Sequence, residues 1–201
     1  MRNLITIAFT ITLFVLATSA SADSNSKPPK SAIKKLLGEI KQIINKDGLS
    51  DADKAENKKH SDVALSVLKV SEISQKALGK YWSKHSEDQQ NQFQTLLENL
   101  FVHVAFPSSA KFFANLKIVY GKTKSKKDMI VVPLTVVHEK EGEVDIDFSL
   151  KQTEAGWQVV DVILDGVSMR NNLRSQFYKI LKKNNFKELI QLMEKKLKET
   201  K

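Results

Sequence analysis

The middle of the chain contains four segments rich in β-branched and aromatic residues, separated by turns rich in glycine or lysine. The segments are residues 117–120, 129–138, 144–150 and 157–164. This composition is typical of strands. Connections this short join antiparallel neighbours, because a parallel pair needs a crossover of a dozen residues or more. The sequence therefore predicts an antiparallel sheet of about four strands.

The third segment indicates which side of the sheet is buried. Its apolar residues alternate strictly with polar ones, so one face is dry and the other wet. The acids Glu141, Glu143, Asp145 and Asp147 could suggest a paired-carboxylate hydrolase, but alternating acids are more typical of a solvated face. Pro133 cannot donate to the ladder, so we place it at an edge or a bulge.

Before the sheet, apolar residues recur at the three- and four-residue steps of a helix face. We expect a helix over residues 31–44, a loop over 47–59, and two short helices or one bent helix over 63–81. A capping box at Ser86 precedes a long apolar face, which predicts a helix that Pro107 ends.

Two amphipathic helices follow the strands, at about residues 173–181 and 186–197, with Asn184 and Asn185 as the break. Helices, then strands, then helices is the order of an α+β fold, in which helices cover one face of an antiparallel sheet. We expect one such domain.

The N-terminus has the three parts of a secretory signal peptide. Arg2 precedes an apolar stretch at residues 4–16, and small residues follow up to Ala22. The stretch is shorter than the roughly 18 residues of a spanning helix. We expect export with cleavage near Ala22, a flexible leader at residues 23–30, and a single domain at residues 31–201.

Cysteine is absent, so an exported chain of this kind is stabilised by apolar burial and not by disulfides. The formal net charge is +9. Because the lysines are spread along the chain without interleaved aromatic residues, we do not expect nucleic-acid binding. For an exported protein, attraction to anionic headgroups at a membrane surface explains the positive charge better than nucleic-acid binding does. The alternative explanation is a basic surface that only faces solvent.

Catalytic motifs are missing from the sequence. The four histidines are scattered, and none has the spacing that pairs two ligands on one helix face or strand, so we expect no metal. Residues 166–170 begin like a nucleophile elbow, but Arg170 stands where its second glycine belongs. We expect a protein that is not an enzyme and has no cofactor.

Two segments resemble one known family. Residues 162–169 and 172–177 read VILDGVSM and NLRSQF, and they resemble the C-terminal signature of the MlaC family, also called the toluene-tolerance auxiliary family. Residues 77–82 and 86–93 resemble that family's Leu-Gly-x-x-Trp segment and the helix that follows it. The similarity spans about residues 70–197.

The resemblance implies a periplasmic phospholipid-binding carrier, which exchanges lipid between an outer-membrane lipoprotein complex and an inner-membrane ABC transporter with an MCE-type subunit. It also implies a twisted sheet like that of nuclear-transport-factor-like cones, with helices around a deep apolar pocket for the acyl chains. Phospholipid would be cargo and not a cofactor, and we expect a monomer. A hopanoid-associated relative, or a carrier of another apolar ligand, is an alternative within the family.

The implied pocket would be lined by large apolar residues on one sheet face and on the helices above it. Ordinary core packing explains the same pattern equally well, because apolar periodicity does not distinguish a filled core from a hollow one. The candidates for lipid binding are Phe93, Leu97, Phe101, Leu134, Val136, Ile146, Phe148, Trp157, Val159, Val167, Met169 and Phe177.

Arg174 follows the Gly-Val-Ser turn, and Asp161 and Asp165 lie on or near the preceding strand. We expect a structural ion pair between Arg174 and one of these acids, and contact of Arg174 with a lipid phosphate is the alternative.

Two other classes of function stay open. An enzyme on a nuclear-transport-factor-like fold would need an acid or a histidine on the inward face of the sheet, where the sequence has apolar residues. A structural adaptor between membrane complexes would need those apolar residues only for folding.

Overall fold

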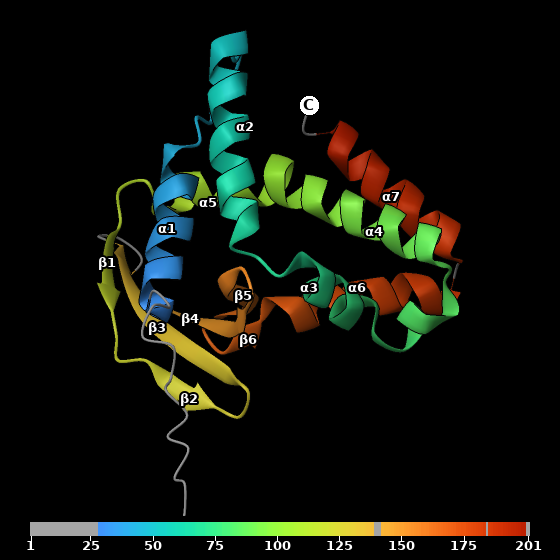
Figure 1. Ribbon diagram of the computed structural model, residues 1–201. Helices are drawn as coiled ribbons and strands as arrows, with labels where there is room; N and C mark the ends of the chain where they lie inside the picture. Colours follow the sequence, from blue (N-terminus) through green and yellow to red (C-terminus); the bar gives the residue numbers. More distant parts are fainter. Residues whose placement is uncertain (1–27, 139–141, 184, 200–201) are drawn as a thin grey trace, which may run out of the picture.

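The computed structural model describes residues 28–138, 142–183 and 185–199, so the expected signal peptide and residues 23–27 of the expected leader lie outside the described residues. The described chain forms an antiparallel sheet. One group of helices packs against the core face of this sheet, and a second group lies beyond its β5–β6 edge (Figure 1). The strands are β1 (Lys117–Tyr120), β2 (Lys124–Lys126), β3 (Met129–His138), β4 (Gly142–Thr153), β5 (Gly156–Leu164) and β6 (Val167–Ser168). The helices are α1 (Pro29–Gln42), α2 (Asp51–Ser66), α3 (Val70–Leu78), the 3-10 turn η1 (Gly79–Lys84), α4 (Glu87–Leu100), the π-helical turn η2 (Phe101–Ala105), α5 (Phe106–Phe113), α6 (Met169–Lys183) and α7 (Phe186–Lys198).

The sheet confirms the expected α+β class and adds two short strands. Its order is β1-β3-β4-β5-β6, and β2 pairs with β3 beyond the end of β1. The four expected strands correspond to β1, β3, β4 and β5. The strands β2 and β6 have three and two residues, which is too short for an alternating pattern to appear in the sequence.

Pro133 lies inside β3 and not at the edge of the sheet. β1 ends opposite Leu134 and β2 begins opposite Val131, so three residues of the β1–β2 connection stand against two of β3. The backbone N–H of Gly121 in that connection donates to the Pro133 carbonyl (2.8 Å). Because the nitrogen of Pro133 faces the same irregular stretch, its missing N–H breaks no regular ladder. The expected edge position is therefore wrong, and Pro133 lies instead opposite the break between β1 and β2.

The segment between α2 and α3 forms one parallel bridge to β5, at Val159. The backbone N–H of Lys69 donates to the Val159 carbonyl (2.9 Å), and the Val159 N–H donates to the Val67 carbonyl (2.8 Å). The second half of β5 pairs with β6. The side of β5 away from β4 is therefore partly paired near both of its ends, which shortens its exposed edge.

Helix α2 corrects the loop expected at residues 47–59. The Ser50 Oγ accepts from the Asp53 backbone N–H (3.1 Å), and the Asp53 carboxylate accepts from the Ser50 N–H (3.0 Å). Ion pairs one turn apart follow along its exposed side. The buried residues of α2 are the small Ser61 and Ala64, so no large apolar stripe marked the helix. A capping box and helix-favouring lysine, glutamate and alanine stabilise it instead.

The region expected as two short helices or one bent helix contains two helices, α2 and α3. Gly79, with φ +49°, ends α3 and begins η1. Pro29 begins α1, so this helix starts two residues inside the expected leader, in a position that proline favours.

Pro107 does not end the helix that starts after Ser86, contrary to expectation. The capping box is confirmed, because the Gln89 N–H donates to the Ser86 Oγ (3.4 Å) and the Ser86 N–H donates to Gln89 Oε1 (3.1 Å). The chain then passes through the π-helical turn η2 into α5, whose first turn contains Pro107. The first turn is where a helix tolerates a missing N–H, and the wider π turn separates the proline from the α4 ladder.

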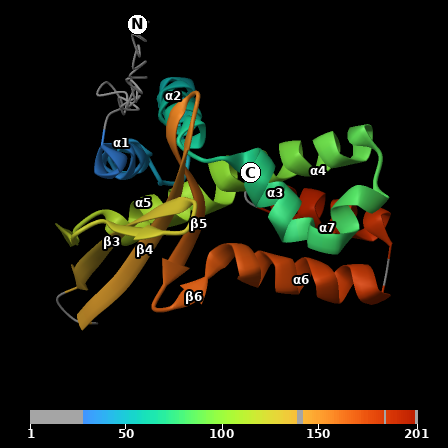
Figure 2. The same ribbon diagram turned by 60° about the horizontal axis from the view of Figure 1, so that its bottom comes forward.

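The helices form two groups around the sheet. α1 packs on the core face of the sheet, with α2 and α5 against it, while α3, α4, α6 and α7 pack on one another beyond β5 and β6 (Figure 1, Figure 2). Asn185 caps α7 by accepting from the Glu188 N–H (3.0 Å). None of the helices in the described ranges is both long and apolar enough to cross a bilayer.

Candidate functional site

One apolar cluster extends from the core face of the sheet to both groups of helices. Two thirds of the residues that the sequence suggested for lipid binding are buried in it, and Phe101 and Trp157 are half-buried against it. The structure thus brings together side chains from β3, β4, β5, α4 and α6. The buried candidates are Phe93, Leu97, Leu134, Val136, Ile146, Phe148, Val159 and Phe177.

Aromatic rings connect the helices within this cluster. Phe93 of α4 meets Phe177 of α6 edge to face, with ring centroids 5.4 Å apart and an interplanar angle of 85°. Phe101 and Phe106 stack at the two ends of η2, with centroids 6.3 Å apart. Such pairs add about 0.5–1.5 kcal/mol beyond the burial of their area. The helical side of the cluster is therefore held by side-chain packing, whereas its other side is a hydrogen-bonded sheet.

Val167 and Met169 lie outside the cluster. Val167 of β6 is 54% exposed, and Met169 is half-buried at the start of α6. Asp165 and Gly166 form the turn before β6, with φ of +44° and +81°. This tight reversal leaves a two-residue edge strand, so the sequence had no periodicity from which to read the side that Val167 faces.

Asp161 is 8% exposed and bonds to the start of α6, but its partner is not Arg174. Its carboxylate accepts from the Ser168 Oγ (2.7 Å) and the Arg170 backbone N–H (3.1 Å), and the Arg170 guanidinium lies 3.6 Å away. Asp165 instead accepts from a backbone N–H of β4 (3.0 Å). The expected ion pair of Arg174 with Asp161 or Asp165 is therefore wrong, because Arg170 is one helical turn closer to the strand.

The two segments that carry the family resemblance contact each other through Phe93 and Phe177, and two hydrogen bonds join them at their ends. The Arg174 Nε donates to the Lys76 carbonyl at the end of α3 (3.0 Å), and the Lys80 backbone N–H donates to the Tyr178 hydroxyl (3.0 Å). A side chain at Gly79 would collide with that hydroxyl, so the junction of α3 and η1 needs glycine. Sequence reasoning missed this contact because the partners in each hydrogen bond are 98 positions apart.

Two open grooves meet at the start of α3. One has a volume of about 430 Å³ and lies between the end of α2, α4 and β5, and the other has about 450 Å³ and lies between α3, η1 and β4. Lys69 and Ser71 line both. Each groove mixes polar with apolar residues, unlike the deep apolar pocket that the resemblance implies. The apolar residues along them are Leu65, Leu68, Val70 and Trp82.

An ion-pair network in the second groove joins α3 to the sheet. The Lys151 Nζ lies 2.8 Å from Glu72 and 2.9 Å from Asp128, and the Lys69 Nζ lies 3.5 Å from Glu72. Burial acts to raise the pKa of Glu72, but the hydrogen bond and charge of Lys151 with the charge of Lys69 outweigh it, so this pKa is lowered. The hydrogen bond from Lys151 likewise lowers the pKa of Asp128. Hydrogen bonds to both acids raise the pKa of Lys151, so all three groups are charged at neutral pH.

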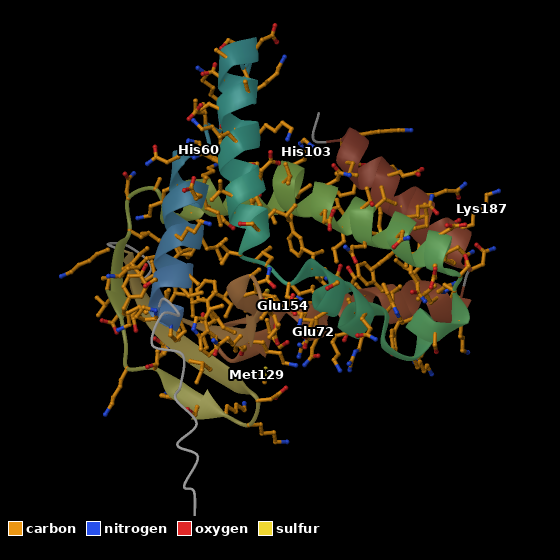
Figure 3. All side chains as sticks on the ribbon, viewed as in Figure 1. His60, Glu72, His103, Met129, Glu154 and Lys187 are labelled. Atoms are coloured by element: carbon orange, nitrogen blue, oxygen red, sulfur yellow. The ribbon has the colours of Figure 1, made fainter. Side chains whose placement is uncertain are left out.

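The described residues contain no group of three or more histidines or acids placed to hold a metal ion. His60 lies 2.7 Å from Glu39 and 3.2 Å from Glu56, and so links α1 to α2 (Figure 3). The described residues thus offer a ligand an apolar interior, with charged side chains at its surface.

Comparisons with known proteins agree with these features. A family model described as MlaC protein matches residues 34–195, which is most of the chain. Among solved structures, the fold is similar to that of the phospholipid-binding protein from Ralstonia solanacearum in complex with a phospholipid. The TM-score is 0.69 at 21% sequence identity, and the match covers 85% of this chain and 95% of that one. A search of curated proteins gives no match. The resemblance read from the Gly-Val-Ser and Leu-Gly segments is confirmed, and this chain belongs to the MlaC family.

Proposed function

We propose that this chain is a periplasmic phospholipid-binding carrier and not an enzyme. The observation that carries the proposal is its membership of the MlaC family, together with a fold similar to that of a protein described as phospholipid-binding. The apolar cluster that joins the sheet to the helices supplies the kind of surface that acyl chains require.

The physics of lipid transfer explains why such a surface is needed. At about 0.8 kcal/mol per methylene, two acyl chains with on the order of 30 methylenes lose roughly 20–25 kcal/mol on entering water. A free phospholipid therefore hardly leaves a bilayer. A carrier must replace nearly all of that apolar contact, and it needs no catalytic group to do so.

In this proposal the acyl chains lie between the core face of the sheet and the helices. The walls are the ten candidates in or against the apolar cluster. The sheet is fixed by its backbone ladders, while α4 and α6 meet through side chains such as Phe93 and Phe177. The helical side can therefore move outward to admit a lipid without breaking strand pairing.

The proposed transport route follows from the family. The chain would be exported, with cleavage near Ala22, and would move phospholipid between an outer-membrane lipoprotein complex and an inner-membrane ABC transporter with an MCE subunit. We expect it to act as a monomer.

The first experiment identifies the cargo. The protein is purified from the periplasm of the cells that produce it and extracted with organic solvent. The extract is then analysed by mass spectrometry. A phospholipid in near-stoichiometric amount supports the proposal, and a hopanoid would indicate the alternative cargo within the family. An extract without lipid, from protein that also takes up none from vesicles, would contradict the carrier function and leave the adaptor.

The second experiment tests the position of the acyl chains. Val136 and Val131 are both buried on β3, but Val136 belongs to the apolar cluster and Val131 lies on the opposite face. Val136→Phe should reduce bound lipid several-fold because it fills space between sheet and helices. Val131→Phe should leave the lipid in place, although overpacking of about 1–3 kcal/mol affects both variants. Equal lipid content in the two folded variants would rule out this position.

A further inference from the structure

The outer margin of the sheet carries an uninterrupted basic segment. Five of the eleven residues 117–127 are lysine and none is acidic. These five lysines, which we call the lysine margin, extend from β1 through the β1–β2 connection to the turn after β2, and all are exposed. They are Lys117, Lys122, Lys124, Lys126 and Lys127.

Within the described residues, Asp128 is the one acid whose pKa shift includes a contribution from a charge of the lysine margin, that of Lys127, and this contribution is the smallest of its causes. No ion pair links any of the five to an acid within the described residues, whereas Asp128, the first acid after them, is bound by Lys151 (2.9 Å). Lys34 of α1 adds to the same region, because its Nζ lies 5.6 Å from the ring centroid of Tyr120 on β1. Val119, between Lys117 and Tyr120, is 48% exposed.

Three acids stand on the middle strand of the outer sheet face. Glu143, Asp145 and Asp147 of β4 point away from the apolar cluster, two strands inward from Lys117 and Val119. An anionic surface would therefore repel the middle of this face and attract its margin. The charge pattern selects an edge-on approach.

We propose that the lysine margin docks on an anionic phospholipid surface, with the sheet standing edge-on to the bilayer. This site is separate from the apolar cluster, so the inference does not depend on acyl-chain binding. Figure 1 shows β1 and β2 on the side of the sheet opposite α4, α6 and α7. The contact would hold the helical side away from the lipid surface.

The side chains favour a lipid surface over an acidic protein. The margin contains no arginine, whose planar fork pairs with carboxylates in fixed geometry. Thr123 and Ser125 lie between the lysines. The one aromatic residue of the segment, Tyr120, is half-buried against the apolar cluster and so is not an exposed anchor of the kind typical of protein interfaces. Mobile ammonium groups suit a fluid, delocalised charge, where each lysine strengthens binding by about fivefold. Lysines also protect exposed strand edges from pairing. Lys122 and Lys127, however, lie outside β1 and β2, where there is no strand edge to protect.

The test measures binding of the purified protein to vesicles. The probes are vesicles of phosphatidylcholine alone and vesicles with a third of phosphatidylglycerol, in low and in physiological salt. One variant carries Lys122→Gln, Lys124→Gln, Lys126→Gln and Lys127→Gln. The matched control carries glutamine at four exposed lysines of α6 and α7, namely Lys179, Lys182, Lys187 and Lys198. Figure 3 places Lys187 far from Met129, which follows the lysine margin.

We expect salt-sensitive binding to the anionic vesicles, a loss of at least about tenfold in the margin variant, and a change of less than about threefold in the control. Equal losses in both variants would overturn the inference, because they would show an effect of net charge alone. Absence of binding to anionic vesicles would overturn it as well, and would direct attention to an acidic protein partner. Lipid content by mass spectrometry should be unchanged in the margin variant, which separates this inference from the proposed carrier function.

Discussion

A single buried carboxylate determines how α6 leaves the sheet. Asp161 on β5 satisfies both the Ser168 hydroxyl and the Arg170 backbone N–H, and Ser168 in turn accepts from the Asn171 N–H (3.1 Å). The first turn of α6 thus obtains partners for groups that a helix start leaves without an intrahelical bond. The side chain is a structural element of the strand-to-helix turn.

This arrangement predicts which double mutants are coupled. Asp161→Ala should lower the free energy of unfolding by about 2–4 kcal/mol, because it leaves the Ser168 hydroxyl, the Arg170 N–H and the Arg170 guanidinium without their acceptor. In urea unfolding, Asp161→Ala and Arg170→Ala should deviate from additivity by about 1 kcal/mol or more. Arg174→Ala serves as the control and should add to Asp161→Ala within about 0.5 kcal/mol. Coupling of Asp161 to Arg174 instead would contradict the observed contacts.

Two glycines should respond in opposite directions to substitution by alanine. Gly79 has φ +49° and faces the Tyr178 hydroxyl, so Gly79→Ala should destabilise the fold by at least about 2 kcal/mol. Gly38 lies within α1 with nothing within 4 Å of an added Cβ, so Gly38→Ala should stabilise it by about 0.5–1 kcal/mol. Thermal unfolding measures both. Adding Tyr178→Phe should recover part of the Gly79→Ala loss, and no recovery would show that backbone strain alone is responsible.

At the scale of elements, the network around Lys151 joins α3 to β4 and to the β2–β3 turn. The pKa values of Glu72 and Asp128 are lowered, and the pKa of Lys151 is raised. The shifts of the acids predict a loss of stability at low pH, and the shift of the lysine predicts a loss at high pH. The contribution from Glu72 and Asp128 is present above their unfolded pKa values and is lost as the pH falls through their lower folded ones. The contribution from Lys151 is present below its unfolded pKa and is lost as the pH rises through its higher folded one.

Comparison with Lys151→Met makes this dependence measurable. The difference in unfolding free energy between the wild type and Lys151→Met should be constant near neutral pH. It should shrink below the usual Glu72 value of 4.5 and above the usual lysine value of 10.5. Lys58→Met breaks an exposed pair with Asp62 and should change stability little at any pH. A difference that did not vary between acid and neutral pH would exclude the network as its cause.

On the scale of the whole molecule, one apolar cluster spans the sheet and both groups of helices. We therefore expect a single cooperative unfolding transition. The two tryptophans report on its two sides, because Trp82 lies in η1 and Trp157 in β5. The variants Trp82→Phe and Trp157→Phe should show coincident fluorescence midpoints in urea. Earlier unfolding on the Trp82 side would show that the helices separate from the sheet as an independent unit.

Phe177→Ala tests the same cluster from α6. Phe177 is 7% exposed and meets Phe93, so its truncation should cost about 3–5 kcal/mol. Leu192 on α7 is 40% exposed, and Leu192→Ala should cost about 0.5 kcal/mol or less. The midpoint of urea unfolding measures both. Similar losses would mean that the cluster does not hold the helical side.

Local patterns in the sequence were sufficient for the class of fold and for most elements. Alternation along β4 and apolar steps along α1, α4 and α7 predict burial on one face, because a strand or helix buries one side of a fixed period. The family signature can also be read from the sequence alone, because its Gly-Val-Ser and Leu-Gly segments are runs of neighbouring residues that need no tertiary contact to be recognised. The helix α2 was missed because it is capped and polar and buries only small side chains.

Other features depend on residues that meet only after folding. The helix continues through Pro107 because the π-helical turn η2 precedes it. Asp161 contacts Arg170 and not Arg174 because Arg170 is one helical turn closer to the strand. The contact between Gly79 and Tyr178 joins segments far apart in sequence. Periodicity reports that a side chain is buried but not which side chain lies opposite it. The sequence by itself therefore determined the elements, the family and a set of buried candidates, and only the tertiary structure decided their partners.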